Sequence, residues 1–121
     1  MKFVNCSNHP SSTWSEKQLT EAEKNGNIID IAFPSVLPEA SEEEIEKMST
    51  ELVQEIMALD PDVVMCEGEF TLTFSTVTKL KREGMKVLAA CSKRETTEEK
   101  MPDGSARKAS VFRFVRFREY V

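Results

Sequence analysis

The sequence is poor in glycine and has none of the common glycine-rich phosphate-binding motifs. Its 121 residues include only four glycines, at positions 26, 68, 84 and 104. A GxGxxG fingerprint and a Walker lysine are therefore both absent. No nucleophile elbow or Ser-His-Asp motif is present either. These absences argue against a nicotinamide-dependent dehydrogenase and a P-loop NTPase.

Long apolar runs are also missing. No stretch approaches the ~20 consecutive apolar residues that a membrane-spanning helix requires, and the first residues lack the layout of a signal peptide. With 40% hydrophobic and 31% charged residues, the composition is that of a globular domain. We therefore expect a cytoplasmic protein with no membrane partner.

Cysteine and histidine are too few for a metal or disulfide framework. Cys6, Cys66 and Cys91 are odd in number and far apart in sequence. Each lies near the end of an apolar run, where cysteine usually serves as a small buried hydrophobe, and a catalytic thiol is the minor alternative. The single histidine has no partner at metal-ligand spacing. We predict no metal site and no cofactor.

Charge is unevenly distributed along the chain. Acidic residues outnumber basic ones by 21 to 16, for a net charge of −5, which argues against binding to long duplex nucleic acid. Acidic residues concentrate in 39–55, whereas 107–118 carries five basic residues and no acidic one. An acidic protein with one basic segment is better suited to a small anionic ligand.

Strand-like and helix-like segments alternate along a single domain that spans residues 1–121. The expected strands are 1–6, 27–33, 62–66 and 85–91, and the helices between them lie within 15–25, 41–59 and 70–83. In the last helix, Phe70, Phe74, Val77 and Leu80 form the expected apolar face. A polar stretch (92–100), a turn at 102–104 and a β-branched and aromatic run (108–120) predict a closing hairpin.

This order predicts an α/β fold with three layers, Rossmann-like, with a mainly parallel sheet. The flavodoxin-like strand order 2-1-3-4 is expected, with the terminal hairpin adding antiparallel strands at one edge. In such sheets, ligands bind at the carboxyl ends of the strands beside the point where the order reverses.

Two polar loops are predicted to meet at that point. The first, residues 7–13, follows the first strand, and the second, residues 67–73, follows the third. Both offer hydroxyl groups and the free N–H groups of a helix start, and Gly68 allows a backbone to approach closely. We expect an anion or nucleotide site there; the alternative is a pair of ordinary capped loops.

Three ionisable residues in these loops leave alternatives open. His9 is a general acid/base, a donor to phosphate, or a turn residue before Pro10. Glu67 and Glu69 are unusual beside a phosphate. One of them can bond a ribose hydroxyl or an adenine amino group, or act as a general base. Alternatively, both complement the dipole of the following helix.

The final strand carries arginines among apolar residues. Strict alternation places Arg113 on one face with Val111, Val115 and Phe117, and Arg116 on the other with Phe112 and Phe114. An arginine in a buried strand requires a partner. The candidates are an acid such as Asp30, a bound phosphate, or a second subunit, and apolar residues on both faces favour self-association.

The two loop motifs, SNHPSS at 7–12 and GEFTLT at 68–73, together with the layout, resemble the CARF-like, Rossmann-type sensors of type III CRISPR systems. More narrowly, the chain resembles the small stand-alone ring nucleases that degrade cyclic oligoadenylate. The resemblance covers most of the chain as architecture but only these two segments as motif.

The resemblance implies a homodimer that binds cyclic oligoadenylate, or another small nucleotide, on its two-fold axis. It implies metal-independent cleavage in antiviral signalling, in which a ribose 2′-hydroxyl attacks the adjacent phosphate. His9, Ser11 and Glu69 are then the catalytic candidates. The ligand-binding candidates are Ser7, Asn8, Ser12, Glu67, Gly68, Thr71, Thr73, Arg113 and Arg116. The alternatives are a non-catalytic nucleotide sensor and a small protein-interaction subunit.

Overall fold

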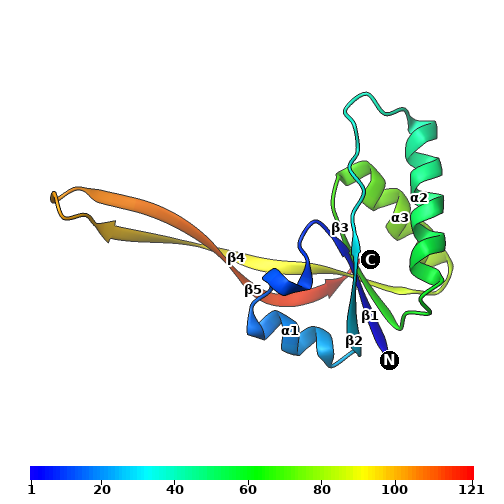
Figure 1. Ribbon diagram of the computed structural model, residues 1–121, viewed down its shortest axis with the longest axis horizontal. Helices are drawn as coiled ribbons and strands as arrows, with labels where there is room; N and C mark the ends of the chain where they lie inside the picture. Colours follow the sequence, from blue (N-terminus) through cyan, green and yellow to red (C-terminus); the bar gives the residue numbers. More distant parts are fainter.

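A five-stranded sheet runs through the protein in the order β2-β1-β3-β4-β5 (Figure 1). The computed structural model describes residues 1–121. Its strands are β1 (Lys2–Ser7), β2 (Asn27–Ala32), β3 (Val63–Glu67), β4 (Lys86–Lys100) and β5 (Ala106–Glu119). The first four strands are parallel and β5 runs antiparallel to β4. The predicted fold class and strand order are confirmed.

The three helices lie within the ranges that the sequence predicts. They are α1 (Glu16–Glu23), α2 (Glu42–Met57) and α3 (Phe70–Arg82), with a short 3-10 turn η1 (Ser11–Thr13) before α1. The hydroxyls of Ser15 and Ser41 accept hydrogen bonds from backbone N–H groups in the first turns of α1 and α2. None of the helices combines the length and apolarity required to cross a bilayer.

The helices cover both faces of the sheet. Alternate residues of β1 point to opposite sides: Val4 and Cys6 pack with α2 and α3, whereas Phe3 packs with α1. All three side chains are fully buried. β1 is therefore an apolar strand with helices on both sides, as is typical of a parallel sheet.

The predicted apolar face of α3 is partly wrong. Phe70 and Phe74 are 89% and 75% exposed, while Leu72 and Thr76 are buried. The helix is oriented by its contact with α2, where the Ser49 and Ser75 hydroxyl oxygens lie 2.7 Å apart. Small residues allow this close approach, so the large rings lie on the outer side.

The terminal hairpin is longer than predicted. β4 does not end near Cys91 but continues to Lys100, and it pairs with β5 as far as Ala106. Most of this ribbon extends away from the helices (Figure 1); residues 92–113 are called the arm below. Opposite charges pair across it, with Glu98 beside Lys108 and Glu99 beside Arg107, which helps a two-stranded ribbon to hold together.

A β-bulge marks the base of the arm. Cys91 lies opposite Arg116, but Ser92 lies opposite Phe114, so Val115 is an extra residue in β5. One extra residue reverses the inward and outward alternation beyond it. The predicted division of Arg113 and Arg116 between two faces, which assumed strict alternation along the strand, is therefore wrong.

The bulge brings two β5 rings into one aromatic cluster. The centroids of Phe114 and Phe117 are 4.8 Å apart. Phe117 also lies 5.3 Å from Phe3 and 6.2 Å from Trp14. This cluster joins the base of the arm to β1 and to the segment before α1.

We expect Phe114→Ala to lower the free energy of unfolding by about 3–5 kcal/mol, because it empties a buried aromatic site. Val115→Ala is the matched control: Val115 is 45% exposed, so its loss should cost less than about 1 kcal/mol. Urea unfolding measures both values. Equal losses in the two variants would show that the cluster does not anchor the arm.

Candidate functional site

The carboxyl ends of β1 and β3 lie side by side, because Ser7 pairs with Glu67. The two predicted loops therefore start at neighbouring positions on one edge of the sheet. They then diverge: the first leads to α1 on one face, and the second leads to α3 on the other. The arm extends from the same edge. It is formed by β4, which neighbours β3, and by β5, which neighbours β4.

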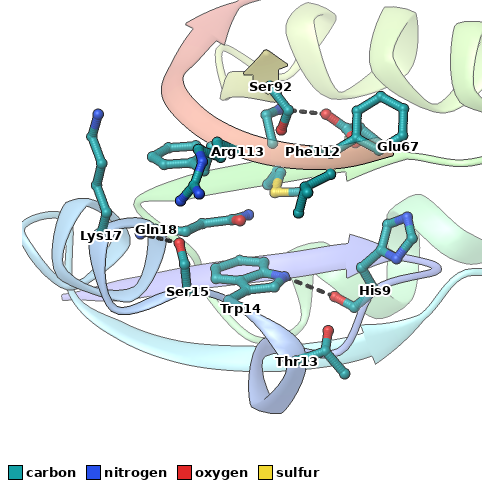
Figure 2. Close-up of a pocket in the computed structure, with 14 residues that line it drawn as sticks. His9, Thr13, Trp14, Ser15, Lys17, Gln18, Glu67, Ser92, Phe112 and Arg113 are labelled. Atoms are coloured by element: carbon teal, nitrogen blue, oxygen red, sulfur yellow. Dashed lines mark hydrogen bonds between the residues drawn. The ribbon is translucent and has the colours of Figure 1, made fainter. Parts of the chain in front are cut away.

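A cavity of about 920 Å³ lies between the first loop, α1 and the arm, and is called the large cavity below. Its lining includes His9 and Trp14 before α1, Lys17 on α1, Glu67 at the end of β3, and the arm residues 111–113. Figure 2 shows His9 and Glu67 toward one end of this cavity, and Lys17 and Arg113 toward the other. It thus combines aromatic rings, two basic side chains, a carboxyl group and an imidazole.

The structure divides the predicted site residues between two hollows. His9, Glu67 and Arg113 line the large cavity. Ser7 and Asn8 instead line a smaller one of about 240 Å³ on the β2 side, together with residues of β1 and β2. Ser11 and Ser12, in η1 between them, are among the lining residues of neither.

The rest of the second loop serves the start of α3. Glu69 is its N-cap and accepts hydrogen bonds from the backbone N–H groups of Thr71 and Leu72 and from the Thr71 hydroxyl. These bonds lower the pKa of Glu69, the Thr71 N–H contributing most. Thr73 Oγ1 is buried without a hydrogen-bond partner. The hydrogen bonds that Glu69 accepts at the start of α3 support the helix-capping alternative for this residue.

Gly68 lies against the side chain of Phe33, the residue that follows β2. A Cβ atom at this position would lie 2.3 Å from Cδ1 of the Phe33 ring, and Phe33 is itself buried. Glycine is thus required at position 68 because a protein side chain, the Phe33 ring, packs closely against it.

Hydrogen bonds hold the backbone of His9 in place. Its carbonyl oxygen accepts from Asn5 Nδ2 at 2.9 Å and from Trp14 Nε1 at 3.0 Å. Its N–H donates to Ser7 Oγ at 3.2 Å. Asn5 is only 1% exposed, so the anchor of this loop is buried beneath it, while the imidazole of His9 is exposed toward the cavity.

Asp30 completes this network from β2. Its carboxylate accepts hydrogen bonds from Asn5 Nδ2, at 2.9 Å, and from the N–H and hydroxyl of Ser11, at 3.2 and 2.8 Å.

Asp30 is therefore not the partner of Arg113. That arginine pairs with Glu95 across the arm, with Nε 2.5 Å from the carboxylate. Both side chains are largely exposed, and Arg116 is also exposed, its Nε donating to the carbonyl of Phe117.

Glu67 is the carboxylate that faces the large cavity. Burial raises its pKa, while the hydrogen bond from the Ala90 N–H and the charge of nearby His9 partly oppose the shift. A carboxylate with a raised pKa is a better general base than an ordinary one, and its protonated form is a usable acid. Both groups line the cavity toward the same end (Figure 2).

Cys6 and Cys66 are packing residues rather than nucleophiles. Cys6 and Cys66 are register partners on β1 and β3, and both are fully buried. A hydrogen bond with Cys6 and burial raise the pKa of Cys66, so it stays a thiol. No cluster of three or more His, Cys, Asp or Glu side chains is arranged to hold a metal ion.

Sequence reasoning missed part of the cavity lining. Trp14, Lys17 and Phe112 were not among the predicted site residues, because the sequence does not show that the predicted hairpin lies beside α1. The hairpin that carries Phe112 was predicted, but no local pattern in the sequence shows which element it packs beside.

Glu67→Gln tests the ionisation of the cavity acid. A carboxyl with a raised pKa stabilises the fold fully below its ordinary value of 4.5, and this contribution is lost as the pH rises through the folded value. The stability of Glu67→Gln relative to the wild type should therefore increase from about pH 4 to about pH 7. Urea unfolding across this range measures it, with exposed Glu51→Gln as the control. A relative stability that falls with pH would contradict the raised pKa.

Gly68→Ala tests whether this glycine serves packing. Overpacking against Phe33 should destabilise the protein by about 1–3 kcal/mol. In a Phe33→Ala background the same substitution should cost little, because the obstructing ring is gone. Chemical denaturation of the four proteins in this cycle gives the coupling. An unchanged cost in both backgrounds would separate Gly68 from Phe33.

Comparisons with known proteins give a family but no assigned activity. The comparison with curated proteins found no match, and neither did the comparison with solved structures. The sequence pattern of the uncharacterized protein MJ1673 family matches residues 1–118, nearly the whole chain. The strands, the helices and the arm that enclose the large cavity all fall essentially within this match, and the chain belongs to the MJ1673 family.

Proposed function

We propose that the large cavity binds a small oligonucleotide, in the first place cyclic oligoadenylate, and cleaves its phosphodiester bonds without a metal ion. This activity would make the protein a cytoplasmic ring nuclease of type III CRISPR antiviral signalling. The observation that carries the proposal is the presence of His9 and Glu67 in one cavity with Lys17 and Arg113. The alternative of a non-catalytic sensor uses the same cavity.

Charge and shape support an anionic ligand with flat groups. Lys17 and Arg113 stand on different walls, one on α1 and one on the arm. Cations on two sides can neutralise successive phosphates. Trp14 and Phe112 supply aromatic surface between polar groups, which suits nucleobases better than a purely polar sugar phosphate.

The proposed reaction requires one base and one acid. Glu67 takes the proton from a ribose 2′-hydroxyl as its oxygen attacks the adjacent phosphorus. The bond from phosphorus to the 5′-oxygen breaks, and His9 in its imidazolium form protonates that oxygen. The products are a 2′,3′-cyclic phosphate and a free 5′-hydroxyl, and no water or metal is consumed. The hydrogen bond between Ser11 and Asp30 holds the loop that carries His9 in place.

A homodimer is part of the proposal. A two-fold axis through a cyclic ligand would let each cavity act once on either half of the ring. The exposed rings of Phe70 and Phe74 on α3 provide apolar surface for association. The same two rings favour the second candidate, a protein-interaction subunit, which would bind a partner protein and no nucleotide.

Incubation with labelled cyclic oligoadenylates of different ring sizes, in EDTA, tests the activity. Linear products ending in a 2′,3′-cyclic phosphate are expected. His9→Ala and Glu67→Gln should lower kcat about 10²–10⁴-fold with smaller changes in binding, because each removes a proton-transfer group. Ser11→Ala should also slow cleavage more than it weakens binding, through loss of the Asp30 bond.

Glu51→Gln on α2 is the control for loss of one carboxylate, and it should retain the wild-type rate. Binding without cleavage would identify the sensor. Neither binding nor cleavage, with any ring size, would refute the nucleotide proposal. Unchanged rates in both His9→Ala and Glu67→Gln would remove this pair from the mechanism.

A further inference from the structure

Two phenylalanines on the same face of β5 differ sharply in burial. Phe112 and Phe114 are two residues apart on the same side of the bulge, so their side chains point to the same face. Phe114 is 7% exposed and Phe112 is 71% exposed. The aromatic cluster at the base of the arm covers the first ring, and the protein leaves the second largely uncovered.

Phe112 is nevertheless not on an empty surface. It lines the large cavity together with Glu67 and His9, and Figure 2 shows it beside Glu67 on the arm side. A large apolar ring that is held at the wall of a polar cavity, with little cover from its own chain, is positioned to contact a ligand.

We propose that Phe112 is the surface on which a nucleobase stacks, and that the neighbouring Arg113 binds a phosphate of the same ligand. This inference rests on the proposed function and adds the residues that recognise the base. The aromatic face attracts any base through stacking, without a requirement for a hydrogen-bonding pattern. The arm is then a ligand-binding element.

The geometry of Arg113 agrees with a phosphate contact. Glu95 engages its Nε atom, which fixes the side chain and leaves the terminal guanidinium nitrogens for phosphate oxygens. Lys17 faces the same end of the cavity from α1 (Figure 2). A base on Phe112, beside Glu67, therefore lies near the end that holds His9, and the cations lie toward the other end.

Trp14 supplies a direct test, because it is the only tryptophan in the chain and lines the cavity. Its fluorescence is titrated with adenosine monophosphate and with ribose 5-phosphate, which carries the same phosphate but no base. Phe112→Ala should weaken binding of adenosine monophosphate about tenfold or more and leave ribose 5-phosphate unchanged. Phe112→Trp would confuse the signal, so Phe112→Tyr is the conservative variant and should retain affinity.

Val115→Ala is the matched control, since Val115 is an exposed apolar residue of the same strand that does not line the cavity. Equal affinity of the wild type and Phe112→Ala for adenosine monophosphate would overturn the stacking role while leaving the proposed function in place. A parallel loss for both ligands would also overturn it, because the base would not be the group recognised. If the wild type binds neither compound and cleaves no cyclic oligoadenylate, both proposals fail.

Discussion

The extra residue in β5 is the constraint on which the site depends. Val115 interrupts the alternation of the strand opposite Cys91 and Ser92. Phe117 therefore packs against Phe3 and Trp14, and Phe114 packs against Phe117. Without Val115, one of the two β5 rings would face the opposite side of the sheet and the aromatic cluster would lose a member. The bulge therefore anchors the base of the arm and positions the adjoining part of the arm over the cavity.

A second constraint is the buried polar network at the end of β1. Asn5 links the carbonyl of His9 to the carboxylate of Asp30, and Asp30 in turn holds Ser11. Polar groups that are removed from water must find partners, and here those partners are the residues of the loop itself. These hydrogen bonds thus hold the loop that carries His9, while the imidazole faces the large cavity.

These two features together explain why only His9, of the three predicted catalytic residues, lines the large cavity. The Ser7 and Ser11 hydroxyls bond to Asn5 and Asp30, and Gly68 packs on Phe33. His9, Glu67 and the arm are left to line the cavity. Glu67 has a raised pKa because it is partly buried beneath the arm side of the sheet. Glu69, only two residues later, has a lowered pKa because the first N–H groups of α3 stabilise its charge. Neighbouring carboxylates thus acquire different chemistry from their surroundings.

The sequence by itself determined the local elements and their order. Ser15 and Ser41 mark the starts of helices, and apolar runs such as the one ending at Cys66 indicate buried strands. The alternation of helices and strands along the chain favours a parallel sheet with a strand reversal. These properties depend on residues close together in the chain. Only the tertiary structure decided that Asp30 binds Ser11 rather than Arg113, that Glu67 rather than Glu69 faces the cavity, and that Phe112 lies over it. Each of these outcomes depends on strand register, on a single-residue bulge and on contacts between distant segments, which the periodicity of a sequence does not encode.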